Sequence, residues 1–306
     1  MKRTFLKHLV GLVGLLAITI VSASAQDQII DDEAYYPEGL HWDPKTKSLL
    51  YAEMTRNRVA QYRDNNKATI QMPGGCGPTD IDRVESGVVI ACHLGGYVLI
   101  INDQGEVFAR IPDLGADSAL RNPNALASDG VGFYVSSSGR FAEDAPAEGT
   151  ILYWHPERGL KPVVQNLHYA NGVFYDAGTR RLFVSEHLGR RVWEFKVNAG
   201  GDIEEAKIFA DLTTFLSQQA PLTGPDGINV MSDGSVVVAI YGASRALVFT
   251  PEGRAKGQFV IDERYITATA KKADEDILFA GGAISNLTPP FLGKVRSIPL
   301  SAMQPF

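Results

Sequence analysis

A short motif recurs six times along the chain at intervals of 41 to 55 residues, and this repeat restricts the possible folds more than any other feature. In each copy, one oxygen-bearing residue lies within a short apolar stretch. A turn and then a β-rich run follow this stretch. The six oxygen-bearing residues are Glu38, Thr79, Asn124, Asn171, Asp226 and Thr267. Four-stranded units of this length are typical of β-propellers. We therefore predict an all-β fold, a six-bladed β-propeller.

Short runs rich in valine, isoleucine and aromatic residues supply the expected strands, for example residues 87–91, 181–185 and 235–239. Turn residues separate them, as in all-β proteins. A long antiparallel sandwich or barrel would explain the strands but not the period. Residues 27–34 also form a β-rich segment, and we expect it to close the ring against the last blade.

The first 25 residues have the pattern of a signal peptide. Lys2 and Arg3 give a basic start, residues 9–21 are an apolar run, and Ala23-Ser24-Ala25 is a cleavage pattern. The run is too short for a comfortable membrane span. We expect cleavage after Ala25, a periplasmic or secreted location, and a single propeller domain over residues 26–306.

The net charge argues against one class of binding partner, and the two cysteines predict a covalent cross-link. The formal net charge is −6, and removal of the basic leader makes the chain more acidic, which argues against a nucleic-acid partner. The two cysteines, Cys76 and Cys92, flank the first two strands of the second repeat unit. Antiparallel pairing brings those positions together, so we predict a disulfide at the rim.

The six repeated residues are expected to form a ring, because the first strand of each blade lines the central channel. Two carboxylates buried there without a cation would reduce the stability of the folded protein by several kcal/mol. Oxygen-only ligands suit calcium, whereas the histidines and cysteines that zinc prefers do not cluster. Asn-Gly and Asp-Gly dipeptides are individually common in turns. The shared position nevertheless favours a metal site, with Thr79 and Thr267 lining it or binding metal-bound water.

The second strand of each blade ends on the same face as this ring. His93 lies at one such end and is the candidate general base, although a surface-loop histidine is the alternative. Tyr241 lies at another end and is expected to contact substrate. The segments 139–149 and 281–293 reach the same face and are candidate lids, or plain surface loops.

Four of the motifs resemble the blade starts of the senescence-marker-protein, gluconolactonase and luciferin-regenerating-enzyme-like family. They are Glu38-Gly-Leu-His-Trp-Asp, Pro123-Asn124-Ala-Leu, Asn171-Gly-Val and Pro225-Asp226-Gly-Ile. The resemblance implies a six-bladed propeller that hydrolyses sugar lactones, other lactones and some organophosphates. It also implies a metal, usually calcium, held by Glu38, Asn171 and Asp226. Asn124 would contact substrate, or bind the metal as in related diisopropyl fluorophosphatases and paraoxonases.

Three further positions refine this resemblance. Residues 89–93 resemble the paraoxonase segment that bears a catalytic-site histidine, which is His93 here. Many family members have aspartate where this chain has Ala125. Some have arginine where it has Asn122, with Arg121 one step away. These departures argue against gluconolactone as the substrate more than they argue against lactone hydrolysis as the reaction.

The resulting hypothesis is a calcium-dependent hydrolase of lactones or related esters, acting on a small-molecule substrate. The ion would polarise the carbonyl, Asp226 or His93 would activate a water, and Asn124, Thr79 and Tyr241 would bind substrate. Three alternatives remain open. They are a phosphotriesterase or arylesterase with the same site, a bond-forming strictosidine-synthase-like enzyme, and a metal-stabilised binding propeller without activity.

Overall fold

The computed structural model describes residues 27–111, 120–272 and 275–306. These residues are almost entirely β-strand, with two short 3-10 helices, η1 (Met54–Arg56) and η2 (Leu300–Ala302). Within the described ranges, no helix is both long and apolar enough to cross a membrane. The predicted signal peptide, residues 1–25, lies outside the described residues.

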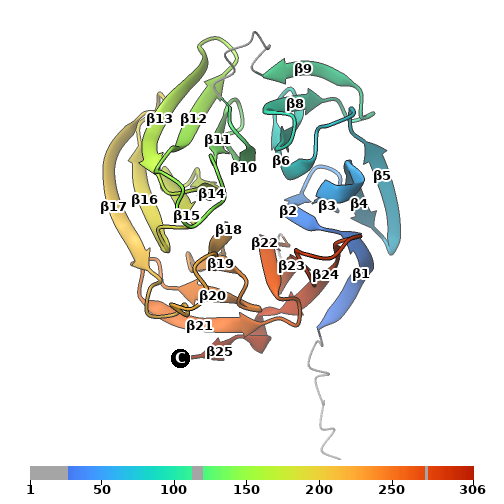
Figure 1. Cartoon of the computed structure of the whole chain (residues 1–306). Coiled ribbons are helices and arrows are strands. Elements are labelled where there is room, and N and C mark those ends of the chain that lie inside the picture. The colour runs from blue at the N-terminus through green and yellow to red at the C-terminus, as the bar shows by residue number, and fades with distance from the viewer. Residues whose placement is uncertain (1–26, 112–119, 273–274) are drawn as a thin grey trace, which may run out of the picture.

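Six antiparallel four-stranded blades surround a central axis, which confirms the predicted six-bladed β-propeller (Figure 1). The first two blades are β2 (Pro37–Asp43), β3 (Ser48–Glu53), β4 (Arg58–Arg63), β5 (Asn66–Gln71), and β6 (Pro78–Val84), β7 (Gly87–Cys92), β8 (Tyr97–Ile101), β9 (Val107–Ile111). The next two are β10 (Pro123–Ser128), β11 (Phe133–Ser137), β12 (Gly149–His155), β13 (Gly159–Leu167), and β14 (Ala170–Asp176), β15 (Arg181–Glu186), β16 (Arg191–Val197), β17 (Ile203–Asp211).

The last two blades share one continuous sheet, because Tyr241 pairs with Tyr265. The fifth blade is β18 (Gly224–Val230), β19 (Val236–Tyr241), β20 (Arg245–Phe249) and β21 (Ala255–Val260), with the short β25 (Gln304–Pro305) added to its outer edge. The sixth is β22 (Tyr265–Lys271), β23 (Ile277–Ala283), β24 (Leu292–Pro299) and β1 (Gln28–Tyr35). The N-terminal strand thus closes the ring, as predicted, with Gln28 opposite Ser297.

The innermost strands β2, β6, β10, β14, β18 and β22 surround the axis, and each contacts the next around the ring (Figure 1). In every blade the register between the first and second strand shifts at the repeated residue. The shift falls between Pro225 and Ile228 around Asp226, for example. A bulge bends a strand and re-aims its side chains. The sequence repeat therefore corresponds to a repeated bulge at the axis.

The hydrophobic core lies between neighbouring blades. Every residue of β3, β7, β11 and β19 is buried, which explains why apolar residues predominate in these strands. At the closure, Leu49 and Tyr51 of the first blade pack with Phe279 and Val295 of the sixth. This packing holds the inner strands close together at the axis.

Candidate metal centre and active site

A cavity of about 320 Å³ opens at one end of the axis. It brings together seven of the eight residues that the sequence singled out for the site: Glu38, Thr79, His93, Asn124, Asn171, Asp226 and Tyr241. Thr267 does not line this cavity, because it borders a narrower cavity of about 90 Å³ further along the channel. Its hydroxyl donates to the carbonyl oxygen of Pro37 at 2.7 Å, so it links the sixth blade to the first.

Two carboxylates lie at the floor of the cavity. Burial raises the pKa of Glu38 well above its usual range, and the nearby charges of Asp226 and Asp80 raise it further. The pKa of Asp226 is also raised, by burial and by Asp80, although the Asn171 side chain and the Gly227 N–H partly offset this. Carboxylates that disfavour one another's charge need a cation or a proton between them.

A third buried carboxylate, Asp80, was missed by the sequence analysis. Burial raises its pKa to about 8, and the charge of Asp82 adds to this effect. Its oxygens accept hydrogen bonds from the N–H groups of Leu126 at 2.7 Å and Ile81 at 2.8 Å. It borders the narrower cavity with Glu38 and Asp226, so it adds negative charge beneath the floor of the site.

The side-chain amide of Asn171 has a defined orientation. Its nitrogen lies 3.2 Å from Nδ1 of His187, whose Nε2 lies 3.1 Å from the carbonyl oxygen of Leu222. A carbonyl only accepts, so Nε2 carries the proton and Nδ1 accepts from the amide. The amide oxygen of Asn171 is buried and has no hydrogen-bond partner among the described residues. Burial lowers the pKa of His187 to about 4, so the ring stays neutral and keeps this arrangement.

This set of oxygens fits a hard cation such as calcium. Glu38 and Asp226 supply charge, and Asn171 supplies an oxygen that nothing else in the structure satisfies. Across residues 27–111, 120–272 and 275–306, no group of three or more histidine, cysteine, aspartate or glutamate side chains is arranged to hold a metal. An ion at the axis would therefore depend on amide oxygens and water in addition to the two carboxylates.

Asn124 and Thr79 lie on the wall nearest to His93. The Thr79 hydroxyl donates to the carbonyl oxygen of Pro123 at 3.2 Å, so its proton is already engaged. The Asn124 side chain hydrogen-bonds the hydroxyl of Tyr169, which also lines the cavity. Asn124 is thus held at the cavity surface, where an amide could contact substrate or a cation.

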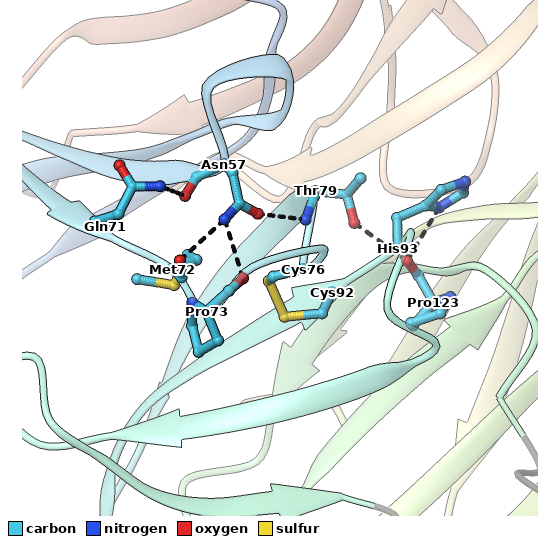
Figure 2. Close-up of a disulfide and its surroundings, with 10 residues drawn as sticks. Asn57, Gln71, Met72, Pro73, Cys76, Thr79, Cys92, His93 and Pro123 are labelled. Carbon is cyan, nitrogen blue, oxygen red and sulfur yellow. Dashed lines mark hydrogen bonds between the residues drawn. A yellow bond between two sulfur atoms is a disulfide. The ribbon is translucent and has the colours of Figure 1, made fainter.

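His93 shares the Pro123 carbonyl with Thr79, as Figure 2 shows. Its Nδ1 lies 3.2 Å from that oxygen, and the neutral ring therefore donates from Nδ1 and leaves Nε2 unprotonated. Burial lowers the pKa of His93, although the bond to Pro123 acts in the opposite direction. A neutral histidine that lines the cavity has the chemistry of a general base.

The predicted disulfide between Cys76 and Cys92 is present, with its Cα atoms 4.4 Å apart (Figure 2). It joins the loop before β6 to the end of β7. The next residue, His93, donates its backbone N–H to Gly77 at 3.0 Å. The disulfide therefore braces the segment that carries the candidate base.

The upper wall of the cavity is aromatic, and the sequence analysis missed most of it. Tyr36 and Tyr169 stand two residues before Glu38 and Asn171, in left-handed backbone with φ of 50° and 60°. Phe141 comes from the predicted loop 139–149, and loop 281–293 contributes Asn286 and Phe291. Both loops thus border the cavity, whereas their movement as lids stays a prediction.

The fold and the site together define a six-bladed propeller with oxygen-bearing side chains at its axis. The chain belongs to the SMP-30/Gluconolactonase/LRE-like family, whose model matches residues 36–280. This confirms the resemblance found in the blade starts.

Individual relatives agree with this assignment. The chain is 25% identical to lactonase drp35 of Staphylococcus haemolyticus over 264 residues, which cover 81% of this chain and 78% of the relative. Its fold is similar to that of regucalcin from Agrobacterium tumefaciens, which is described as a calcium-binding protein. The two structures give a TM-score of 0.73 at 14% identity, and the match covers 90% of this chain and 93% of regucalcin. A gluconolactonase from Xanthomonas campestris gives a TM-score of 0.71 at 17% identity, and the match covers 91% of this chain and 89% of the gluconolactonase.

Proposed function

We propose that this protein is a calcium-dependent hydrolase of lactones. The observation that carries the proposal is the meeting of Glu38, Asp226 and the unpartnered amide oxygen of Asn171 at the floor of one cavity. Membership of a family that includes gluconolactonases supports lactone hydrolysis, as do the curated relatives named lactonases. The similarity to a calcium-binding propeller supports the choice of metal.

The roles of the residues follow from their placement. Glu38, Asn171 and Asp226 would hold the ion, and Asn124 would either complete its coordination or bind the substrate. A bound divalent cation would polarise the lactone carbonyl and stabilise the negative charge that develops on its oxygen. Tyr241 and Thr79 would confine the substrate above this floor.

His93 is the base that we propose for the attacking water. Nε2 accepts the proton while Nδ1 remains hydrogen-bonded to Pro123. Burial lowers the pKa of His93 from its ordinary value near 6.5, which favours the neutral ring that can accept a proton. Asp226 is the alternative base, but its carboxylate is needed to hold the ion.

We further propose that the mature chain begins after Ala25 and acts in the periplasm or outside the cell. The basic start, the apolar run and the cleavage pattern support this location. The Cys76–Cys92 disulfide also supports it, because such bonds persist in oxidising compartments.

The decisive experiment assays purified mature protein against gluconolactone, γ- and δ-lactones, phenyl acetate and paraoxon, with calcium and with EDTA. We expect lactone turnover that EDTA abolishes and calcium restores. Preference for paraoxon would identify a phosphotriesterase instead. A calcium-dependent rise in melting temperature without turnover of any ester would identify a binding propeller.

A second experiment tests whether His93 is the general base. His93→Gln keeps a side chain able to donate to Pro123, so the variant should fold and bind calcium normally. We expect its kcat to fall by about 100-fold, within the range measured for general bases. Unchanged kcat in this variant would assign the proton transfer to another group.

A further inference from the structure

The walls of the cavity above the carboxylates present a continuous aromatic surface. The ring centres of Phe141 and Tyr169 are 4.8 Å apart, and Phe141 also meets Tyr241 edge-on at 6.1 Å. On the other side, Tyr36 and Phe291 meet edge-on at 6.2 Å. All five side chains line the cavity. A substrate that enters therefore meets ring faces and edges before it reaches Glu38 and Asp226.

The polar groups of this wall are largely engaged with one another. The hydroxyls of Tyr36 and Tyr241 are 3.0 Å apart, and Asn286 donates its side-chain N–H to Tyr241 at 2.9 Å. Both ring nitrogens of His187 are also occupied. Among the described residues, the buried Oδ1 of Asn286 has no hydrogen-bond partner and offers this wall one acceptor. A substrate with several hydroxyls would still bury some of them here without partners, which is costly. The wall is therefore poorly suited to a sugar.

Positive charge is also lacking in the wall. Among the described residues, neither lysine nor arginine lines the cavity. Arg121 and Arg140 border an adjoining hollow instead, where Arg121 lies 3.7 Å from Glu148 and Arg140 lies 3.3 Å from Asp144. In the part of the chain that the structure describes, a substrate with its own carboxylate or phosphate would find no lysine or arginine beside the carboxylate floor.

Three exposed leucines are close in the chain or by hydrogen bonding to residues that line the cavity, although they do not line it themselves. Leu94 follows His93 and is 66% exposed, and Leu287 follows Asn286 and is 83% exposed. Leu222, whose carbonyl oxygen accepts a hydrogen bond from Nε2 of His187, is 39% exposed. Single exposed leucines are ordinary, so the apolar character of the site rests on the aromatic side chains that line the cavity.

We infer that the substrate is a lactone with an apolar alkyl or aryl substituent, and not a sugar lactone. The carbonyl lies at the carboxylate floor and the substituent lies against Phe141, Tyr169 and Phe291. Water adds to the carbonyl carbon, the bond to the ring oxygen breaks, and that oxygen takes a proton to give a hydroxy acid. This inference rests on the proposed lactone hydrolysis and adds the substrate class to it.

The test compares γ-lactones that carry no side chain or unbranched chains of two, four and six carbons, with gluconolactone as the polar reference. We expect kcat/KM to rise about threefold for each added methylene, since each buries further apolar surface. Gluconolactone should be at least 100-fold poorer than the longest lactone. Equal or better turnover of gluconolactone would overturn the substrate class and leave lactone hydrolysis intact. Failure to turn over any lactone would instead remove the proposed function and this inference with it.

A pair of variants tests the position of the substituent. Phe141→Ser shortens a partly exposed side chain of a surface loop, so folding should survive. We expect it to flatten the dependence of kcat/KM on chain length, with the largest loss for the longest lactone. Phe108→Ser is the matched control, because Phe108 is 53% exposed on β9 and does not line the cavity. A full chain-length dependence in Phe141→Ser would contradict the proposed placement.

Discussion

His187 fixes the orientation of the Asn171 amide, because its Nδ1 accepts from the amide nitrogen at 3.2 Å. The amide oxygen is consequently left for a ligand at the axis. Groups that orient metal ligands typically contribute 10- to 100-fold to metal affinity. We therefore expect His187→Phe, which keeps ring size but removes the acceptor, to weaken calcium binding by about 10- to 100-fold.

Isothermal titration calorimetry on wild type, His187→Phe and His187→Gln would measure this effect. Glutamine can accept from Asn171 and donate to Leu222, so it should recover part of the affinity. Unchanged affinity in His187→Phe would show that the amide is oriented by other contacts.

Asp226→Asn should separate stability from activity. The substitution removes one of three mutually repelling buried carboxylates, so the metal-free protein should become more stable at pH 8. Calcium should no longer raise its melting temperature. Turnover should fall by about 1000-fold, since several kcal/mol of transition-state stabilisation depend on the ion.

Thermal unfolding with EDTA and with calcium, together with a lactone assay, would test all three expectations. Asp144→Asn is a suitable control, because the Asp144 side chain is 81% exposed. Wild-type turnover in Asp226→Asn would show that the axial site is not catalytic.

The metal-free protein should lose stability as pH rises from about 6.5 to about 8. Glu38, Asp226 and Asp80 have raised pKa values, and that of Asp80 is about 8. The folded state then holds protons that the unfolded chain has released, and unfolding becomes easier as pH rises. His187 acts in the opposite direction, but only between its folded pKa of about 4 and its ordinary value near 6.5.

Urea unfolding at pH 6.5 and pH 8 would measure this loss, which is at most about 1.4 kcal/mol per pH unit for each proton involved. Calcium should reduce it by neutralising the carboxylates, and Asp80→Asn should flatten it in EDTA. A metal-free protein that gains stability over this range would show that the three carboxylates are already ionised at pH 6.5.

Removal of the disulfide should destabilise the fold and disturb the candidate base. The bond joins residues 16 apart, and loop closure of that size is worth about 3 kcal/mol in the chain-entropy model. For a domain of this size, that corresponds to a fall in melting temperature of roughly 6–12 °C. Cys76→Ser/Cys92→Ser should show this fall in a thermal scan and a reduced kcat, since His93 follows Cys92 directly. Reduced wild type should match the double variant, and an unchanged kcat would show that His93 is held without the disulfide.

The ring at the axis was predictable because a propeller converts a repeat in sequence into a circle in space. Asp80 could have been found by the same logic. The position after each ring residue is otherwise occupied by glycine or alanine, at residues 39, 125, 172, 227 and 268. The small residues are needed because inner strands approach closely: a Cβ on Gly172 would lie 2.0 Å from the Asp226 carbonyl oxygen. Aspartate at that position in one blade marks a buried carboxylate.

The aromatic wall was not predictable from the repeat. Phe141 and Phe291 come from loops, which have no periodicity that would give their direction. Tyr36 and Tyr169 adopt the left-handed backbone conformation, which bulky residues rarely do. Their local sequence therefore does not predict this conformation or the direction of their side chains. The orientation of Asn171 likewise depends on His187 from the neighbouring strand end, and only the folded structure brings the two together.

The pairing of β1 with β24 has a consequence for the order in which the molecule can fold. Gln28 and Ser297 come from opposite ends of the chain, so the last blade cannot be completed until the final strands have been synthesised. Until then β1 has no partner, and the unfinished sheets expose edges that invite association with other chains. Contacts between such distant residues also form slowly. Even a short C-terminal truncation into β24 would therefore leave an open ring that is prone to aggregate, although most of the blades would be intact.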